Sequence, residues 1–178
     1  IGSLGFKSIV ADGYWLEAVQ LIGEKNLAKE NYNQLYQLID RTTDFDPQFS
    51  YAYEVGGVFF SLHANRIDLS NAILLKGINR DSTSWQPWFY LGFNYFYHLK
   101  DTQKGAYYIA EASKRRKPLP PYFPLLAARL YAQGGRPETA IFFLKTVYLN
   151  TKEETIKENI KRRIEELEKE VMEQTINK

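Results

Sequence analysis

The stretch that decides the fold is residues 86–98, which read QPWFYLGFNYFYH. A shift of 35 residues places it on residues 51–63, which read YAYEVGGVFFSLH. The matched pairs are Trp88 with Tyr53, Gly92 with Gly57, and Tyr95 with Phe60. Large residues fall on large ones and small on small ones. Such self-similarity at a fixed spacing is the signature of a repeat architecture.

The same spacing continues on both sides of this stretch. Further pairs at this spacing are Ser70 with Gly105, Leu74 with Ile109, Gly77 with Ala112, Ala140 with Gly105 and Leu144 with Ile109. A shift of one residue adds Ala128 with Gly92 and Tyr131 with Tyr95. In the other direction, Leu35, Ile39 and Thr42 precede Ser70, Leu74 and Gly77, and Asp46-Pro47 precedes Asp81-Ser82. Small residues at matched positions indicate close helix crossings, because a bulky partner fills the space of the missing side chain. We infer three good repeats and one degenerate repeat.

Apolar residues at spacings of three and four predict helices throughout the chain. The expected ranges are 9–22, 31–43, 49–62, 67–79, 86–98, 103–115, 121–133, 137–149 and 153–174. The loops between them carry helix-breaking or helix-starting residues at Asp46-Pro47, Asp101-Thr102, 118–121 and 134–137. No β-hairpin signal competes with these helices. The sequence therefore predicts an all-α fold.

A helix-turn-helix unit with this length and this alternation of large and small residues resembles the tetratricopeptide (TPR) repeat. The resemblance covers residues 9–150 and departs from the family at Ser70, Gly105 and Pro124. It implies an α-solenoid of about four repeats, with a C-terminal capping helix. The implied units are about 9–47, 48–82, 83–118 and 119–150, within an array at 1–150, followed by the helix at 151–178.

The last segment, residues 151–178, differs from the rest in composition. One narrow apolar stripe runs along it, formed by Ile156, Ile160, Ile164, Leu167 and Val171. Charged residues cover the other faces. Repeat arrays need a helix of this kind to close their apolar ends, so we expect a capping helix. The alternative, a homodimeric coiled coil after Leu167, has fewer than three heptads and is not favoured.

In TPR proteins the first helix of each repeat lines an inner groove in which partners bind. Carried over to this chain, the resemblance implies partner-binding residues at Tyr51, Glu54, Val58, Gln86, Phe89, Phe93, Phe96, Tyr97, Tyr122 and Arg129, with Leu125 beside them. Three of them, Phe89, Phe93 and Phe96, share one helical face by their spacing. The opposite face is also apolar, so this helix must be covered. Either another segment of the chain or a partner's peptide or helix covers the row.

The concentrated basic run of the chain is Lys114, Arg115, Arg116 and Lys117. It follows an expected helix and precedes Pro118. Cations at a helix C-terminus compensate the helix dipole, and this accounts for part of the run. The remaining charge suggests contact with a phosphate or an acidic lipid.

Composition excludes several kinds of chemistry. The 178 residues contain no Cys and two His, and the net charge is +2. Thiolate chemistry is therefore excluded, and no bulk charge points to nucleic acid. Phosphate loops, dinucleotide fingerprints and hydrolase motifs are absent. We expect no enzyme activity, no cofactor and no metal site, and His63 and His98 are expected to act as cations at helix ends.

These observations predict a non-catalytic interaction module or assembly scaffold that binds a protein or peptide. The alternative is an obligate structural subunit of a larger, membrane-associated complex. Residues 9–22 are also similar to the start of bacterial TPR proteins that have an N-terminal membrane anchor and no assigned activity. That resemblance implies an anchor before Ile1 and a membrane-associated location in the cell envelope rather than the cytoplasm.

Overall fold

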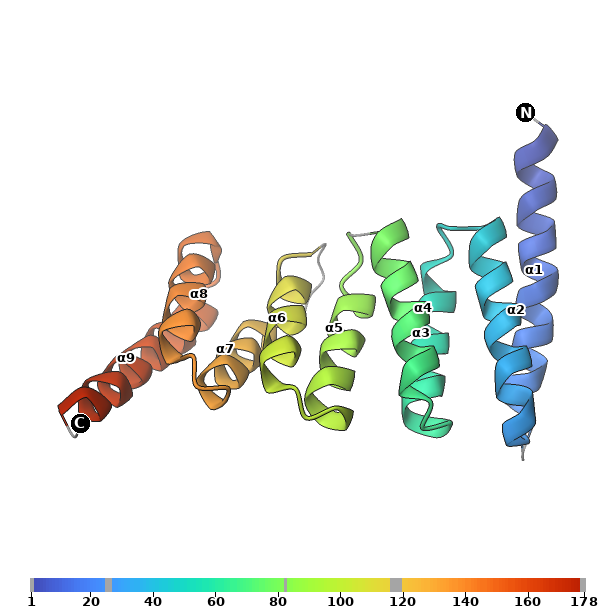
Figure 1. Cartoon of the computed structure of the whole chain (residues 1–178). Coiled ribbons are helices and arrows are strands. Elements are labelled where there is room, and N and C mark those ends of the chain that lie inside the picture. The colour runs from blue at the N-terminus through green and yellow to red at the C-terminus, as the bar shows by residue number, and fades with distance from the viewer. Residues whose placement is uncertain (1, 25–26, 82, 116–119, 177–178) are drawn as a thin grey trace. The chain divides into compact units, whose positions relative to one another are not determined.

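The protein is all-α in the computed structural model, which describes residues 2–24, 27–81, 83–115 and 120–176 (Figure 1). The helices are α1 (Gly2–Gly23), α2 (Tyr32–Phe45), α3 (Ser50–Val58), α4 (Ile67–Arg80), α5 (Gln86–Phe93), α6 (Thr102–Ser113), α7 (Phe123–Gln133), α8 (Pro137–Asn150) and α9 (Glu154–Ile176). These described residues form no strand. The all-α prediction is confirmed. The first helix begins at Gly2 rather than Ile9, because glycines weaken the helix signal of residues 2–8 in the sequence.

The chain divides into two compact units, residues 1–91 and residues 92–178. In the first unit, α1 packs on α2, α2 on α3, and α3 on α4. In the second unit, α6 packs on α7, α7 on α8, and α8 on α9. Within each unit, these helices therefore pack on their neighbours in the sequence. Within the first unit, Figure 1 shows α1 and α2 side by side, with the N-terminal part of α1 extending past α2.

Each unit has its own apolar core. Fully buried side chains of the first unit include Leu35, Ile39, Tyr53, Phe60 and Ile73, and those of the second include Ile109, Phe123, Leu130, Leu144 and Ile160. Burial of one such side chain contributes about 1.5–3 kcal/mol. The first-unit core also receives Trp15 and Tyr14 from α1.

The backbone repeats the same helix ending every 35 residues. Asn65, Lys100 and Gly135 have positive φ angles of 52°, 57° and 76°. The next helix begins two residues later in each case, at Ile67, Thr102 and Pro137. Five residues in π-helical form precede the first two of these endings, at Phe59–His63 and Asn94–His98. A non-glycine residue rarely adopts positive φ, so its recurrence at one spacing marks equivalent places in the chain.

Matched glycines allow close helix approach at equivalent places. A Cβ atom added to Gly57 of α3 would overlap the Leu74 side chain of α4. A Cβ added to Gly92 of α5 would lie 2.7 Å from Cγ1 of Ile109 and 3.0 Å from the backbone oxygen of Gly105, both in α6. The bulky side chain on the second helix fills the space above the glycine. The recurrence of small residues at matched positions in the sequence has this physical cause.

The last helix, α9, packs on α8 through part of the predicted apolar stripe. Its buried residues are Ile160, Ile164 and Leu167. Lys145 of α8 adds an ion pair to Glu168, with Nζ 2.7 Å from Oε1. Both partners of this pair are partly exposed, so its contribution is below about 1 kcal/mol. Apolar burial therefore dominates the contact.

The two histidines that the sequence predicts as helix-end cations lie at matched helix ends, but the surroundings of His98 disfavour its charged form. His63 and His98 each end a π-helical turn, and the His63 ring stacks on Phe59 with the ring centroids 5.6 Å apart. Burial and then the nearby Lys100 lower the pKa of His98 below its usual value. This shift disfavours the charged imidazolium form that a helix-end cation would need. In the described ranges, no helix is both long enough and apolar enough to cross a membrane.

Candidate binding groove

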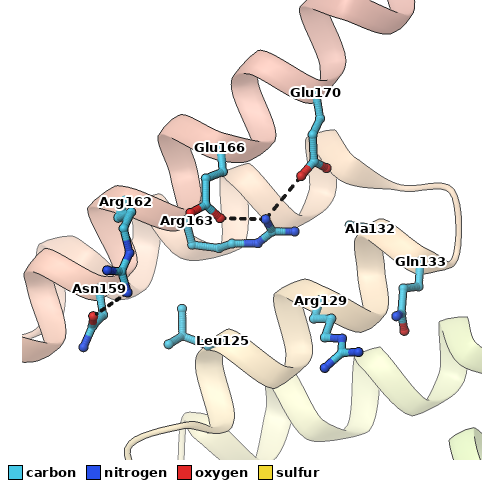
Figure 2. A pocket seen from close by; sticks show the side chains of 9 residues that line it. All are labelled: Leu125, Arg129, Ala132, Gln133, Asn159, Arg162, Arg163, Glu166 and Glu170. Carbon is cyan, nitrogen blue, oxygen red and sulfur yellow. Dashed lines mark hydrogen bonds and ion pairs between the residues drawn. The ribbon is translucent and has the colours of Figure 1, made fainter.

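A groove of about 590 Å³ lies between α7 and α9 in the second unit (Figure 2). Its lining residues are Leu125, Arg129, Ala132 and Gln133 of α7, and Asn159, Arg162, Arg163, Glu166 and Glu170 of α9. Spacings of three and four place each set on one face of its helix. The groove therefore combines a small apolar surface with three guanidinium groups and two carboxylates.

The α9 wall is organised by interactions along the helix. Nη1 of Arg163 donates to Oε2 of Glu166 at 2.8 Å and to Oε1 of Glu170 at 3.3 Å. Partial burial opposes the charge of Arg163, but these carboxylates outweigh it and raise its pKa. Nη2 of Arg162 donates to the neutral Oδ1 of Asn159 at 3.0 Å. Arg163 is thus neutralised by neighbours, whereas Arg162 keeps its full charge.

The α7 wall presents Arg129 to solvent. In Figure 2 its side chain extends away from Glu166 and Glu170. Within the described ranges it forms neither an ion pair nor a hydrogen bond through its side chain, and it is exposed. Leu125 lies one turn earlier on the same face. An exposed guanidinium beside an apolar side chain is able to receive an acidic group from a bound chain.

The predicted aromatic row, formed by Phe89, Phe93 and Phe96, is divided between the two units. Phe89, in the first unit, contacts Trp85 and Tyr90 edge to face, with ring centroids 6.1 and 5.5 Å away. In the second unit, Phe93 stacks on Tyr97 at 5.1 Å with an interplanar angle of 14°. All three rings of the row are half-buried.

Phe96 differs from its neighbours in the row. A Cβ atom added to Gly105 of α6 would lie 2.7 Å from the Cβ of Phe96. Phe96 therefore takes part in packing on α6. The close approach at Gly105 places the backbone of Phe96 against α6, while its ring stays half-buried like those of Phe89 and Phe93.

Besides Phe89, four predicted residues lie in the first unit. Tyr51 is 58% exposed and meets Trp15 edge to face at 5.9 Å. Burial raises the pKa of Glu54, and a hydrogen bond from Tyr90 opposes that rise. Val58 is half-buried, and Gln86 accepts a hydrogen bond of 2.7 Å from Ser84 Oγ. The structure thus brings Glu54 next to Tyr90, a residue that the repeat pattern did not select.

Two further predicted partner-binding residues, both exposed tyrosines, lie in the second unit. Tyr97 is 53% exposed, and Nζ of Lys100 lies 5.1 Å from its ring centroid. Tyr122 is 55% exposed and meets Phe123 edge to face at 5.3 Å. Neither tyrosine lines the groove between α7 and α9. Of the predicted residues, Arg129 and Leu125 lie in that groove. Sequence reasoning missed its α9 wall, since a charged helix face gives no signal of a groove beside it.

The basic run is partly neutralised. Lys114 and Arg115 both form ion pairs with Glu111, one turn earlier on α6. Arg116 and Lys117 lie outside the described residues. The carboxylate of Glu111 therefore pairs with two cations here.

Comparison with known proteins adds no family to these observations. No protein-family model matches the chain, and no curated protein shows significant similarity to it. In the described part of the chain, no group of three or more His, Asp or Glu side chains is arranged to hold a metal ion.

Proposed function

We propose that the chain is a non-catalytic protein-interaction module made of about four TPR-like repeats, closed at one end by α9. The repeat assignment rests on positive φ at Asn65, Lys100 and Gly135, and on the paired glycines Gly57 and Gly92. Both features have the spacing of the sequence repeat. Stacked helix pairs of this kind offer extended surfaces for partner binding.

The groove between α7 and α9 is the proposed binding site. The observation that carries this proposal is the exposed Arg129, which has no ion-pair partner in the described residues and lies beside Leu125 in the groove. The uncompensated charge of Arg162 faces the same space. The expected ligand is a peptide or helix with alternating apolar and acidic side chains. Phe93, Tyr97 and Tyr122 provide aromatic contacts elsewhere in this unit, since exposed aromatic rings are common binding hot spots.

A random peptide library tests this site. The wild-type chain is expected to select peptides enriched in Asp or Glu beside apolar residues. The Arg129→Glu variant is expected to select no such peptides. Its affinity for a peptide selected by the wild type is expected to fall by about tenfold or more, because the new carboxylate repels the acidic side chains of the peptide. Lys161→Glu makes the same charge change on an exposed part of α9 outside the groove and is the matched control. Equal loss in both variants, or no enrichment of acidic residues, would reject the groove as the site.

The second candidate is an obligate structural subunit of a larger, membrane-associated complex. It is favoured by the outer face of α1, where Phe6, Ile9 and Leu16 are 68%, 69% and 61% exposed. An exposed apolar patch of this kind marks a surface that contacts a protein partner or a membrane. Sedimentation of the isolated chain distinguishes the two candidates. A binding module remains monomeric over a wide concentration range, whereas an isolated obligate subunit self-associates, and Ile9→Ser with Leu16→Ser reverses that association.

A further inference from the structure

A second and larger pocket, of about 1080 Å³, lies among the end of α6, the start of α7, the second half of α8 and the start of α9. Its interior is apolar, with Phe123 and Phe143 buried behind it and Val147 and Ile156 half-exposed along it. Small-molecule pockets measure roughly 300–1,000 Å³. The volume is thus sufficient for one ligand of considerable size.

The walls of this pocket offer almost no hydrogen-bond donors to a ligand. Three prolines, Pro120, Pro121 and Pro124, form one side and have no backbone N–H. The uncharged polar side chains donate to carbonyl oxygens of their own helices instead. These bonds run from Ser113 to Ala110 at 2.7 Å, Thr146 to Phe142 at 3.1 Å, Asn150 to Thr146 at 2.8 Å and Thr151 to Val147 at 2.8 Å.

This donor-poor interior disfavours a peptide backbone. Each buried peptide group that finds no partner costs about 1–3 kcal/mol by mutational measures. An apolar chain has no such groups and loses nothing in these surroundings. The walls therefore favour a hydrocarbon chain as the occupant.

The rim of the pocket is positively charged. Lys114 and Arg115 share the single carboxylate of Glu111. Lys152 forms no ion pair within the described residues. Among the described residues that line the pocket, three are basic, Lys114, Arg115 and Lys152, and one, Glu153, is acidic. An anionic group at the mouth of the pocket complements this charge.

We propose that this pocket binds one molecule of an anionic single-chain amphiphile, with its hydrocarbon chain against Val147 and Ile156 and its phosphate or carboxylate head at Lys114 and Lys152. The pocket is lined by both apolar and basic side chains, which matches the two ends of such a molecule. The site is separate from the groove of Figure 2 and does not depend on the function proposed for it.

The test measures binding of monododecyl phosphate to the whole chain by titration calorimetry and native mass spectrometry, below the concentration at which micelles form. One saturable equivalent is expected. Inorganic phosphate is expected to give no detectable binding, because most of the affinity comes from the buried chain. Dodecylphosphocholine, with the same chain and no net charge, is expected to bind roughly three- to tenfold more weakly.

Three variants locate the ligand. Val147→Asp places a carboxylate in the apolar wall and is expected to weaken binding by about tenfold or more. Leu149→Asp, on the same helix but 82% exposed and outside the lining, is the matched control and is expected to bind normally. Thr146→Phe fills the exposed mouth and gives an independent block if Val147→Asp does not fold. Lys152→Gln is expected to reduce the affinity for monododecyl phosphate and to leave the affinity for dodecylphosphocholine unchanged. Lys161→Gln is the control.

Several outcomes overturn the proposal. These are the absence of one-to-one binding, equal binding of inorganic phosphate, and unchanged binding in both Val147→Asp and Thr146→Phe. Equal affinity for the two dodecyl ligands would remove the role of the basic rim. Association with phosphatidylglycerol vesicles, without binding of the monomeric phosphate, would assign the cations to a membrane surface and reject a pocket.

Discussion

The terminal helices α1 and α9 differ in how much of their apolar surface is buried. The last helix, α9, buries Ile160, Ile164 and Leu167 on one side and carries charged residues on the others. The first helix, α1, buries Ala11 and Ala18 on one side, yet exposes Phe6, Ile9 and Leu16 on the other. One terminal helix presents a polar surface, and the other presents an apolar one.

This difference shows which terminal helix buries its apolar surface within its own unit. A helix with one apolar stripe satisfies its hydrophobic surface by packing on a single neighbour. A helix that is apolar on two sides needs a second neighbour, which α2 alone does not supply. Of the three predictions below, the first and last compare α1 with α9 and the second compares α1 with α3, and each is able to break the contrast.

The largest expected effect is the loss of core packing under α9. Leu167 is fully buried, so Leu167→Ala is expected to lower the free energy of unfolding by about 2–5 kcal/mol. Leu16→Ala on the outer face of α1 is the matched change and should cost less than about 0.5 kcal/mol. Urea unfolding followed by circular dichroism measures both.

Hydrogen exchange in α8 and α9 is the second readout, because Trp15, Trp85 and Trp88 all lie in the first unit and their fluorescence does not report the second. If Leu16→Ala cost as much as Leu167→Ala, the outer face of α1 would be part of a core, and the contrast between the ends would fail.

The fold was predictable where one physical cause acts locally. Helix positions followed from apolar spacing, and the small residues at matched positions predicted close helix crossings, of which Gly57 against Leu74 is one. The binding surface was harder to predict. Phe93 and Phe96 have the same sequence signal, but Phe96 meets Gly105 of α6 whereas Phe93 stacks on Tyr97. That outcome depends on the neighbouring helix and not on the spacing within one helix.

Sequence reasoning also missed both hollows of the second unit. The groove needs α9 to lie beside Arg129, and the larger pocket needs four helix ends to meet around Val147. Contacts between segments far apart in the sequence create these spaces, and no short pattern encodes them. Arg129 was selected through the TPR resemblance. Lys114 and Arg115 were selected because four like charges exceed what a helix end requires.

The next largest effect concerns two glycines in contrasting surroundings. A Cβ atom at Gly13 of α1 would meet nothing within 4 Å, whereas one at Gly57 would overlap Leu74. Gly13→Ala is therefore expected to stabilise the chain by about 0.5–1 kcal/mol through helix propensity. Gly57→Ala should destabilise it by about 1–3 kcal/mol through overpacking.

Thermal unfolding at several protein concentrations checks this pair. Loss of stability in Gly13→Ala that grows with concentration would mean that a second copy packs closely on α1 in solution. The apolar end would then be closed by self-association, and the contrast with α9 would hold only for the isolated chain.

The smallest effect concerns charge. The carboxylates of Glu166 and Glu170 hold Arg163 on α9, whereas the described charged residues of α1 form no ion pair. Glu166→Gln is expected to cost about 0.2–1 kcal/mol, because the carboxylate is half exposed. Glu17→Gln on α1 should change nothing measurable. Urea midpoints at about 0.05 and about 1 M sodium chloride separate the two, since salt at the higher concentration screens charges beyond about 3 Å and should shrink the difference between Glu166→Gln and wild type. A Glu17→Gln effect of the same size and salt dependence would place α1 in a charged contact and overturn the view that its exposed surface acts through apolar residues.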